Sequence, residues 1–110
     1  MLNKKYRFHS RGGVQYVYQK GKTIRKPLGS LVFVKNERGF TRFAVVVSKK
    51  VLKTAVDRNR VRRRVYETIR QNFTKLPQSH DYIFIIHDKK VKDIPYSELE
   101  EFIASLIREM

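Results

Sequence analysis

Residues 53–70 read Lys-Thr-Ala-Val-Asp-Arg-Asn-Arg-Val-Arg-Arg-Arg-Val-Tyr-Glu-Thr-Ile-Arg, and this stretch decides how the rest of the chain is interpreted. At about 100° per residue, apolar residues at i, i+4 spacing predict an amphipathic helix. The members of this apolar stripe are Val61, Val65, Ile69 and Phe73. The stretch holds seven lysine or arginine residues but only two acids, Asp57 and Glu67. A helix that only packs and stays soluble mixes both signs of charge, so we expect this one to lie against a polyanion.

The charge of the whole chain is strongly positive and unevenly distributed. The formal net charge is +15, from 25 lysine and arginine residues against 10 acids. Residues 1–70 carry 20 of these basic residues and three acids, whereas residues 71–110 carry five basic residues and seven acids. A one-sided distribution indicates a binding face, with nucleic acid or an anionic membrane as the candidate partner. Nucleic acid is favoured, because valines beside an arginine-crowded surface are a poor membrane anchor.

The composition is typical of one folded domain that spans residues 1–110. A hydrophobic share of 41%, with seven Phe and six Tyr, argues against a disordered basic tail. Cysteine is absent, which excludes disulfides and thiolate metal sites. No apolar run approaches the ~20 residues of a membrane span, and the N-terminal sequence lacks the apolar core of a signal peptide. We therefore expect a soluble, cytoplasmic protein.

The pattern along the chain predicts helices that alternate with strands. Helices are expected at residues 14–21, 54–73 and 95–110, and strands at residues 30–35, 41–48 and 81–87, with a short extra strand near 23–26. The strand at 41–48 is apolar on both faces, which is typical of the middle of a sheet. This order predicts an α/β (α+β) two-layer sandwich, with about four strands in a mixed sheet and three helices. The helix between strands 41–48 and 81–87 has the length of a crossover between parallel strands, which by default is right-handed.

The residues that would catalyse hydrolysis are not evident. The histidines at positions 9, 80 and 87 are scattered, and neither a Ser-His-Asp nor a His-x-x-x-His spacing occurs. A metal-dependent nuclease needs clustered carboxylates, but Asp57 and Glu67 lie about 15 Å apart along a helix. We interpret both acids as members of surface ion pairs, Asp57 with Arg60 and Glu67 with a nearby arginine. The protein alone is therefore not expected to be a catalyst, and no catalytic or metal-binding residue is assigned.

Arginine suits the backbone of RNA or DNA, because its planar guanidinium binds phosphate in a bidentate manner. Asn59, between two arginines, either contacts the nucleic acid or caps a local turn. Tyr18 and Phe33 are able to stack on unpaired bases if they lie on an open face, although core packing is the default for each. The arginines, Asn59 and these aromatic residues together predict a nucleic-acid interface.

The sequence around the basic helix resembles the signature of the bacterial ribonuclease P protein subunit. The matching segments are Val47-Ser48-Lys49-Lys50, Ala55-Val56, Arg58-Asn59-Arg60, Arg62-Arg63 and Glu67. The first helix, the last strand and the start of the last helix match as well, so the resemblance covers nearly the whole chain. It implies the protein subunit of an endoribonuclease holoenzyme, which binds a large catalytic RNA and assists removal of the 5′ leader from precursor tRNA. The catalytic Mg²⁺ ions are then held mainly by the RNA subunit, and neither a membrane nor a stable protein partner is implied.

The resemblance also implies roles for particular residues. The implied contacts with RNA are Lys49, Lys50, Lys53, Arg58, Asn59, Arg60, Arg62, Arg63 and Tyr66. The implied contacts with the single-stranded leader are Phe8, Tyr18 and Phe33, with the leader in a cleft between the sheet and the first helix. The crossover through the basic helix is expected to be left-handed, against the default.

Three positions depart from the family pattern. Gly is common where Leu52 stands, Arg is usual at Tyr66, and an aromatic leader contact is common at Val14. At Tyr66 we expect a phosphate contact to be either lost or replaced by stacking, and at Val14 we expect a weaker leader contact. Two other functions compete with the implied one: a structural RNA-binding protein such as a ribosomal component, and a protein-only nuclease.

Overall fold

The computed structural model describes residue 7 and residues 11–37 and 39–110. The helices are α1 (Arg11–Lys20), α2 (Ala55–Gln71) and α3 (Tyr96–Arg108). The strands are β1 (Lys22–Arg25), β2 (Gly29–Lys35), β3 (Arg42–Val47) and β4 (His80–Ile86), and the short 3₁₀ helices η2 (Phe73–Lys75) and η3 (Lys89–Lys92) follow α2 and β4. All the predicted helices and strands are present, with bounds shifted by a few residues. Within the described ranges, none of the helices combines the length and the apolar character that a membrane span requires.

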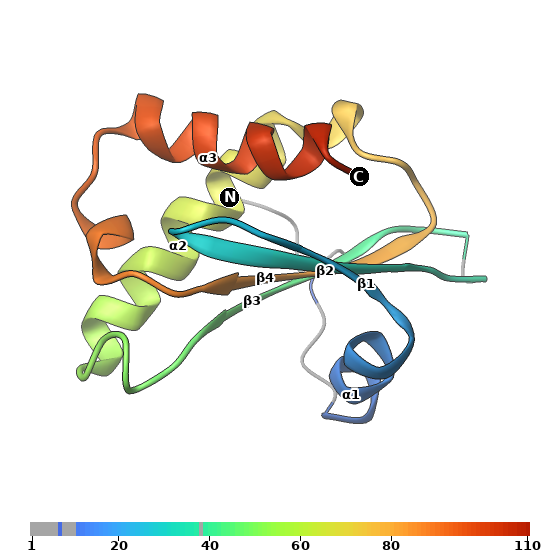
Figure 1. Cartoon of the computed structure of the whole chain (residues 1–110), viewed down its shortest axis with the longest axis horizontal. Helices are drawn as coiled ribbons and strands as arrows, with labels where there is room; N and C mark the ends of the chain where they lie inside the picture. Colours follow the sequence, from blue (N-terminus) through green and yellow to red (C-terminus); the bar gives the residue numbers. More distant parts are fainter. Residues whose placement is uncertain (1–6, 8–10, 38) are drawn as a thin grey trace.

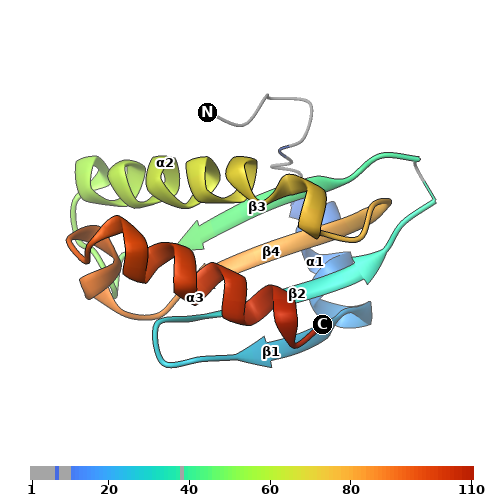
Figure 2. The ribbon, with the colours of Figure 1, turned by 90° about the horizontal axis from the view of Figure 1, so that it is seen from above.

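The four strands form one mixed sheet in the order β1-β2-β4-β3 (Figure 1). β2 pairs antiparallel with β1 and β4, whereas β3 and β4 are parallel and α2 connects them. In Figure 2 the side of the sheet covered by α2 and α3 faces the reader, and β3 points to the left with β4 below it. The chain leaves β3 at the left, runs through α2 on the side of the sheet nearer the reader, and enters β4 below β3. If the view is turned so that β3 points upward, β4 lies to its left, which makes the crossover left-handed. The right-handed default is therefore wrong here, and the handedness that the family resemblance implies is confirmed.

The helices cover both faces of the sheet. α2 and α3 form a layer on one face, and α1 packs on the other (Figure 1). Side chains alternate between these faces along β2, where Leu31 belongs to the core beneath α2 and α3 and Val32 packs near Val17 of α1. The buried residues that α2 and α3 contribute to the larger core include Val61, Val65, Ile69, Leu99, Phe102, Ile103 and Leu106. The predicted four-stranded mixed sheet with three helices is thus confirmed. Because α1 packs opposite α2 and α3, the elements form three layers rather than the two expected.

β3 lies beside only one other strand of the sheet, rather than in its middle as the apolar sequence predicts. Both of its faces are nevertheless covered, because Phe43 and Val45 belong to the larger core whereas Ala44 belongs to the cluster that contains Val17. Arg7 forms an isolated parallel bridge to Phe43. Coverage of both faces, and not a central position, therefore accounts for the apolar run.

Candidate nucleic-acid interface

α2 presents its basic side to solvent because its apolar stripe is buried against the sheet. The completely buried members of the stripe are Val61, Val65 and Ile69. The helix begins after Thr54, whose Oγ1 accepts a hydrogen bond from the backbone N–H of Asp57 at 3.2 Å. Asp57 in the first turn also suits the positive end of the helix dipole. The sequence thus determines both where α2 begins and which side it turns outward.

Two arginines on the outer side of α2 are available for a ligand. Arg60 and Arg63 are exposed, and neither has a hydrogen-bond or ion-pair partner among the residues that the structure describes. Arg62 is half-buried and donates a hydrogen bond to Oδ1 of Asn59 at 2.9 Å. Asn59 is exposed and keeps its amide nitrogen available for a second contact. These four residues therefore present several hydrogen-bond donors on one outward surface.

Arg58 has a different role, because it holds the loop between β3 and α2. Its Nη1 donates hydrogen bonds to the carbonyl oxygens of Leu52 at 3.0 Å and Lys53 at 2.9 Å. Leu52, at the position where Gly is common in the family, is only 7% exposed. Its side chain therefore anchors the loop in the core. Lys49, Lys50 and Lys53 on the same loop are all exposed. Arg58 therefore positions a lysine-bearing loop beside the arginines of α2.

Arg64 connects α2 to the segment that follows β4. Its guanidinium donates hydrogen bonds to the carbonyl oxygens of Val91 at 2.7 Å, Lys92 at 2.8 Å and Ile94 at 2.5 Å. Backbone carbonyls accept from both Nη atoms, in the manner that the forked guanidinium favours. Arg64 is therefore, like Arg58, an arginine of α2 that holds the protein's own backbone.

This connection brings a second group of lysines to the same surface. A hollow of about 490 Å³ lies between the loop before α2 and η3, and its lining includes Leu52, Lys89, Lys90 and Lys92. The sequence does contain a signal for this arrangement. Parallel neighbouring strands end at the same edge of a sheet, so the lysine pairs after β3 (49–50) and soon after β4 (89–90) must lie near each other. The predicted interface therefore extends to η3.

Tyr66 does not fit the predicted contact with RNA. Its side chain is 5% exposed and belongs to the larger core. Burial raises the pKa of the phenol, an effect that the backbone of Val45 and the nearby Arg7 and Arg62 oppose. The guanidinium of Arg7 lies 5.3 Å from the centre of the ring, as in a cation–π pair. The ring of Tyr66 is thus engaged by a residue of the same chain.

The two acids of α2 form ion pairs. Glu67 accepts a hydrogen bond from Nη2 of Arg70 at 2.5 Å, and this bond lowers the pKa of Glu67 to about 2. Asp57 lies 3.7 Å from Nζ of Lys92, rather than beside Arg60 as expected. The interpretation of both acids as surface ion pairs is confirmed, with a different partner for Asp57. In the part of the chain that the structure describes, His, Asp and Glu side chains nowhere form a group of three that could hold a metal ion.

The structure does not bring the predicted leader-binding aromatics together. Tyr18 is 44% exposed and belongs to α1, on one side of the sheet. Phe33 points to the other side, because it is the register partner of Tyr82 and packs against the larger core. Phe8 lies outside the described residues. One cleft between the sheet and α1 therefore cannot hold both Tyr18 and Phe33, because successive side chains of a strand point to opposite faces.

The sheet face that carries α1 is only partly covered, and Val46 and Ile85 are half-buried there. Figure 2 shows α1 behind the end of the sheet at which β4 begins, away from the end at which β3 and β4 terminate. Near that uncovered end, Oγ of Ser30 lies 2.7 Å from Nε2 of His87. The face thus offers apolar and polar groups close to the lysine pair at 49–50.

Comparison with known proteins shows the family to which this chain is related. The family model described as Ribonuclease P matches residues 2–110. The ribonuclease P protein component of Alkaliphilus metalliredigens is 38% identical over 94 residues, which is 86% of this chain and 83% of that protein. The same component of Chloroflexus aurantiacus is 33% identical over 108 residues, which is 98% of this chain and 79% of that protein.

Two solved structures share the fold. The RNase P protein from Thermotoga maritima superimposes with a TM-score of 0.84 at 23% identity, over 94% of this chain and 96% of that one. The Staphylococcus aureus RNase P protein gives a TM-score of 0.83 at 23% identity, over 94% of both chains. Because the family model spans nearly all of the chain and relatives above 30% identity cover most of it, the chain belongs to the ribonuclease P protein family.

Proposed function

We propose that this chain binds the RNA subunit of ribonuclease P through the outer side of α2 and the two lysine-bearing segments next to it. The observation that carries the proposal is the pair Arg60 and Arg63, exposed and without partners among the described residues. Exposed lysines at 49–50 and 89–90 extend the same positive surface. Phosphates arranged along an RNA strand would neutralise such a surface and release bound counterions.

In this proposal the RNA subunit carries the chemistry and holds the Mg²⁺ ions. The support is the placement of the acids on α2, since Asp57 and Glu67 are each engaged by a basic side chain and lie in different turns. Nucleases that use two metal ions need carboxylates that converge on one point. The protein contributes to endonucleolytic removal of the leader by binding, as the protein subunit of a ribonucleoprotein enzyme in the cytoplasm.

We further propose that the 5′ leader of precursor tRNA lies on the sheet face that carries α1. Tyr18 is the aromatic side chain of α1 with which an unpaired base would stack, and Val46 and Ile85 supply an apolar floor. This face of the sheet borders the lysines at 49–50, so an RNA strand that extends beyond the face would reach the α2 surface. Val14 on the same helix is half-buried and would make a weaker contact with the leader than an aromatic residue would.

Reconstitution tests the proposal. The purified protein is mixed with the cognate RNA subunit and a labelled precursor tRNA at low Mg²⁺ concentration, and leader removal is measured. We expect faster cleavage than with the RNA subunit alone, and none with the protein alone. Cleavage by the protein alone would instead identify a protein-only nuclease. Tight RNA binding without any stimulation would identify a structural RNA-binding protein.

A further inference from the structure

A second basic hollow lies at the other end of the sheet from the lysine pair at 49–50. It measures about 240 Å³, and its lining comprises Lys20, Lys22, Phe33, Val34, Lys35 and His80. These residues include three lysines and an aromatic ring, and none of them is acidic. The volume is below the roughly 300–1,000 Å³ of small-molecule sites, so it suits one nucleotide of a longer strand better than a free cofactor.

The fold assembles this hollow from four elements. Gly21 ends α1 close to β2, and a Cβ added to it would lie 2.8 Å from the carbonyl oxygen of Phe33, so the approach requires glycine. Lys22 after this turn is the register partner of Phe33. The pairing of β1 with β2 ends there, while β2 continues to Lys35, which is the partner of His80. Lys22, Phe33, Lys35 and His80 therefore point to one side of the sheet.

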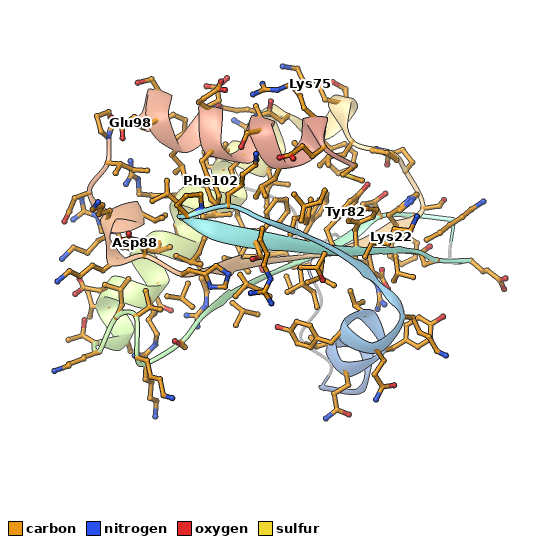
Figure 3. All side chains as sticks on the ribbon, in the orientation of Figure 1. Lys22, Lys75, Tyr82, Asp88, Glu98 and Phe102 are labelled. Carbon is orange, nitrogen blue, oxygen red and sulfur yellow. The ribbon has the colours of Figure 1, made fainter. Side chains whose placement is uncertain are left out.

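Two aromatic rings, those of Phe33 and His80, line the hollow. Phe33 is half-buried next to Tyr82, and the ring of His80 stacks on Tyr82 with centroids 5.7 Å apart. Nδ1 of His80 lies 2.9 Å from the carbonyl oxygen of Gln78, so this nitrogen donates its proton and Nε2 remains for another partner. Figure 3 labels Lys22 and Tyr82 close together at this end of the sheet. A ring platform within reach of lysines is the arrangement that binds unpaired nucleotides.

We propose that this hollow binds one nucleotide of a single-stranded RNA, with the base on Phe33 and His80 and the phosphates on the lysines. The inference rests on the proposed role of the chain in RNA binding but concerns a different surface. β4 separates the two surfaces, and its seven residues span about 20 Å at 3.3 Å per residue. The strand belongs either to the leader of precursor tRNA or to the RNA subunit, which share this chemistry.

The direct test measures binding of a short fluorescent single-stranded RNA as a function of salt. Lys35→Ala should weaken binding and reduce the slope of log K against log salt by about 0.7, the contribution of one phosphate on a single strand. Phe33→Leu keeps apolar volume but removes the ring, so it should weaken binding roughly tenfold without changing the slope. Lys75→Ala is the matched control, because Lys75 is also exposed, does not line the hollow and lies apart from Lys22 (Figure 3). If Lys35→Ala behaves like Lys75→Ala and Phe33→Leu binds like the wild type, the proposal is wrong.

The source of the strand is tested in the reconstituted holoenzyme with precursors that carry a long or a short leader. Weaker binding of the Lys35→Ala variant to the long-leader precursor alone would assign the nucleotide to the leader. Weaker binding to the RNA subunit would assign it there. Wild-type affinity for both would overturn the proposal. A different result would contradict the proposed function itself. In that case the double variant Arg60→Ala with Arg63→Ala would bind the RNA subunit as tightly as the wild type.

Discussion

α2 and α3 pack on the same face of the sheet through the same kind of apolar stripe, yet their outer sides are opposite in character. α3 carries three glutamates and one arginine, and Arg108 pairs with Glu101 at 2.7 Å. α2 carries six arginines against two acids, and both acids are already paired. Docking on this sheet therefore does not require arginine. The excess on α2 indicates a ligand. The residues that dock each helix are therefore distinct from the arginines that we propose to bind RNA.

The largest effect should come from the docking residues, and it should be similar for both helices. Ile69→Ala in α2 and Ile103→Ala in α3 each remove a completely buried side chain. We expect each to lower the free energy of unfolding by about 2–5 kcal/mol, measured by urea denaturation. A large loss for only one of the two would show that the helices do not dock in the same way.

The second effect should separate the helices. Arg60→Ala with Arg63→Ala should reduce affinity for the RNA subunit on the order of 10²-fold, as two charged hydrogen-bonding contacts are lost. Arg108→Ala in α3 is the control and should leave that affinity unchanged. If the wild-type protein neutralises about six phosphates, its affinity should fall on the order of 10³-fold between about 50 and 200 mM salt. A flat salt titration would show that α2 is not the interface.

The third prediction concerns Arg64, which, like Arg58, donates hydrogen bonds to the backbone of its own chain. Arg64→Ala leaves the carbonyl oxygens of Val91, Lys92 and Ile94 without this donor, so we expect a loss of about 1–3 kcal/mol in the free energy of unfolding. Arg63→Ala should change stability by less than about 0.5 kcal/mol. Affinity for RNA should fall in both variants. An Arg64→Ala variant as stable as Arg63→Ala would contradict the structural assignment.

The smallest effect should come from pH. The hydrogen bond from Arg70 lowers the pKa of Glu67 from its ordinary 4.5 to about 2. Because the pKa is lower in the folded state, the stabilisation is present above pH 4.5 and is lost as pH falls toward 2. Glu67→Gln should therefore flatten the acid limb of the unfolding curve in this range. An acid limb of unchanged steepness would show that the pair contributes nothing to stability.

Most of the fold and part of the site could be predicted from the sequence. The stripe of α2 and the outward direction of Arg60 and Arg63 followed from helical periodicity, which is a local property. The placement of Phe33 beside Tyr18 failed, because a strand alternates its faces and the face that α1 covers is decided by packing. The burial of Tyr66 was missed for a related reason, since it lies between the apolar stripe and the arginine side and its neighbours in space include Arg7.

By itself, the sequence determined the helices and strands, the docking stripe of α2 and the excess of positive charge on the first 70 residues. These features depend on residues close together in the chain. Only the tertiary structure decided which arginines remain available: Arg64 is engaged because the carbonyl oxygens of residues 91–94 lie beside it, about 30 residues away in sequence. It also decided that Phe33 packs on the face of the sheet opposite α1 and lines a separate hollow. Hydrogen-bond partners and strand faces are set by contacts between distant segments, which no local pattern records.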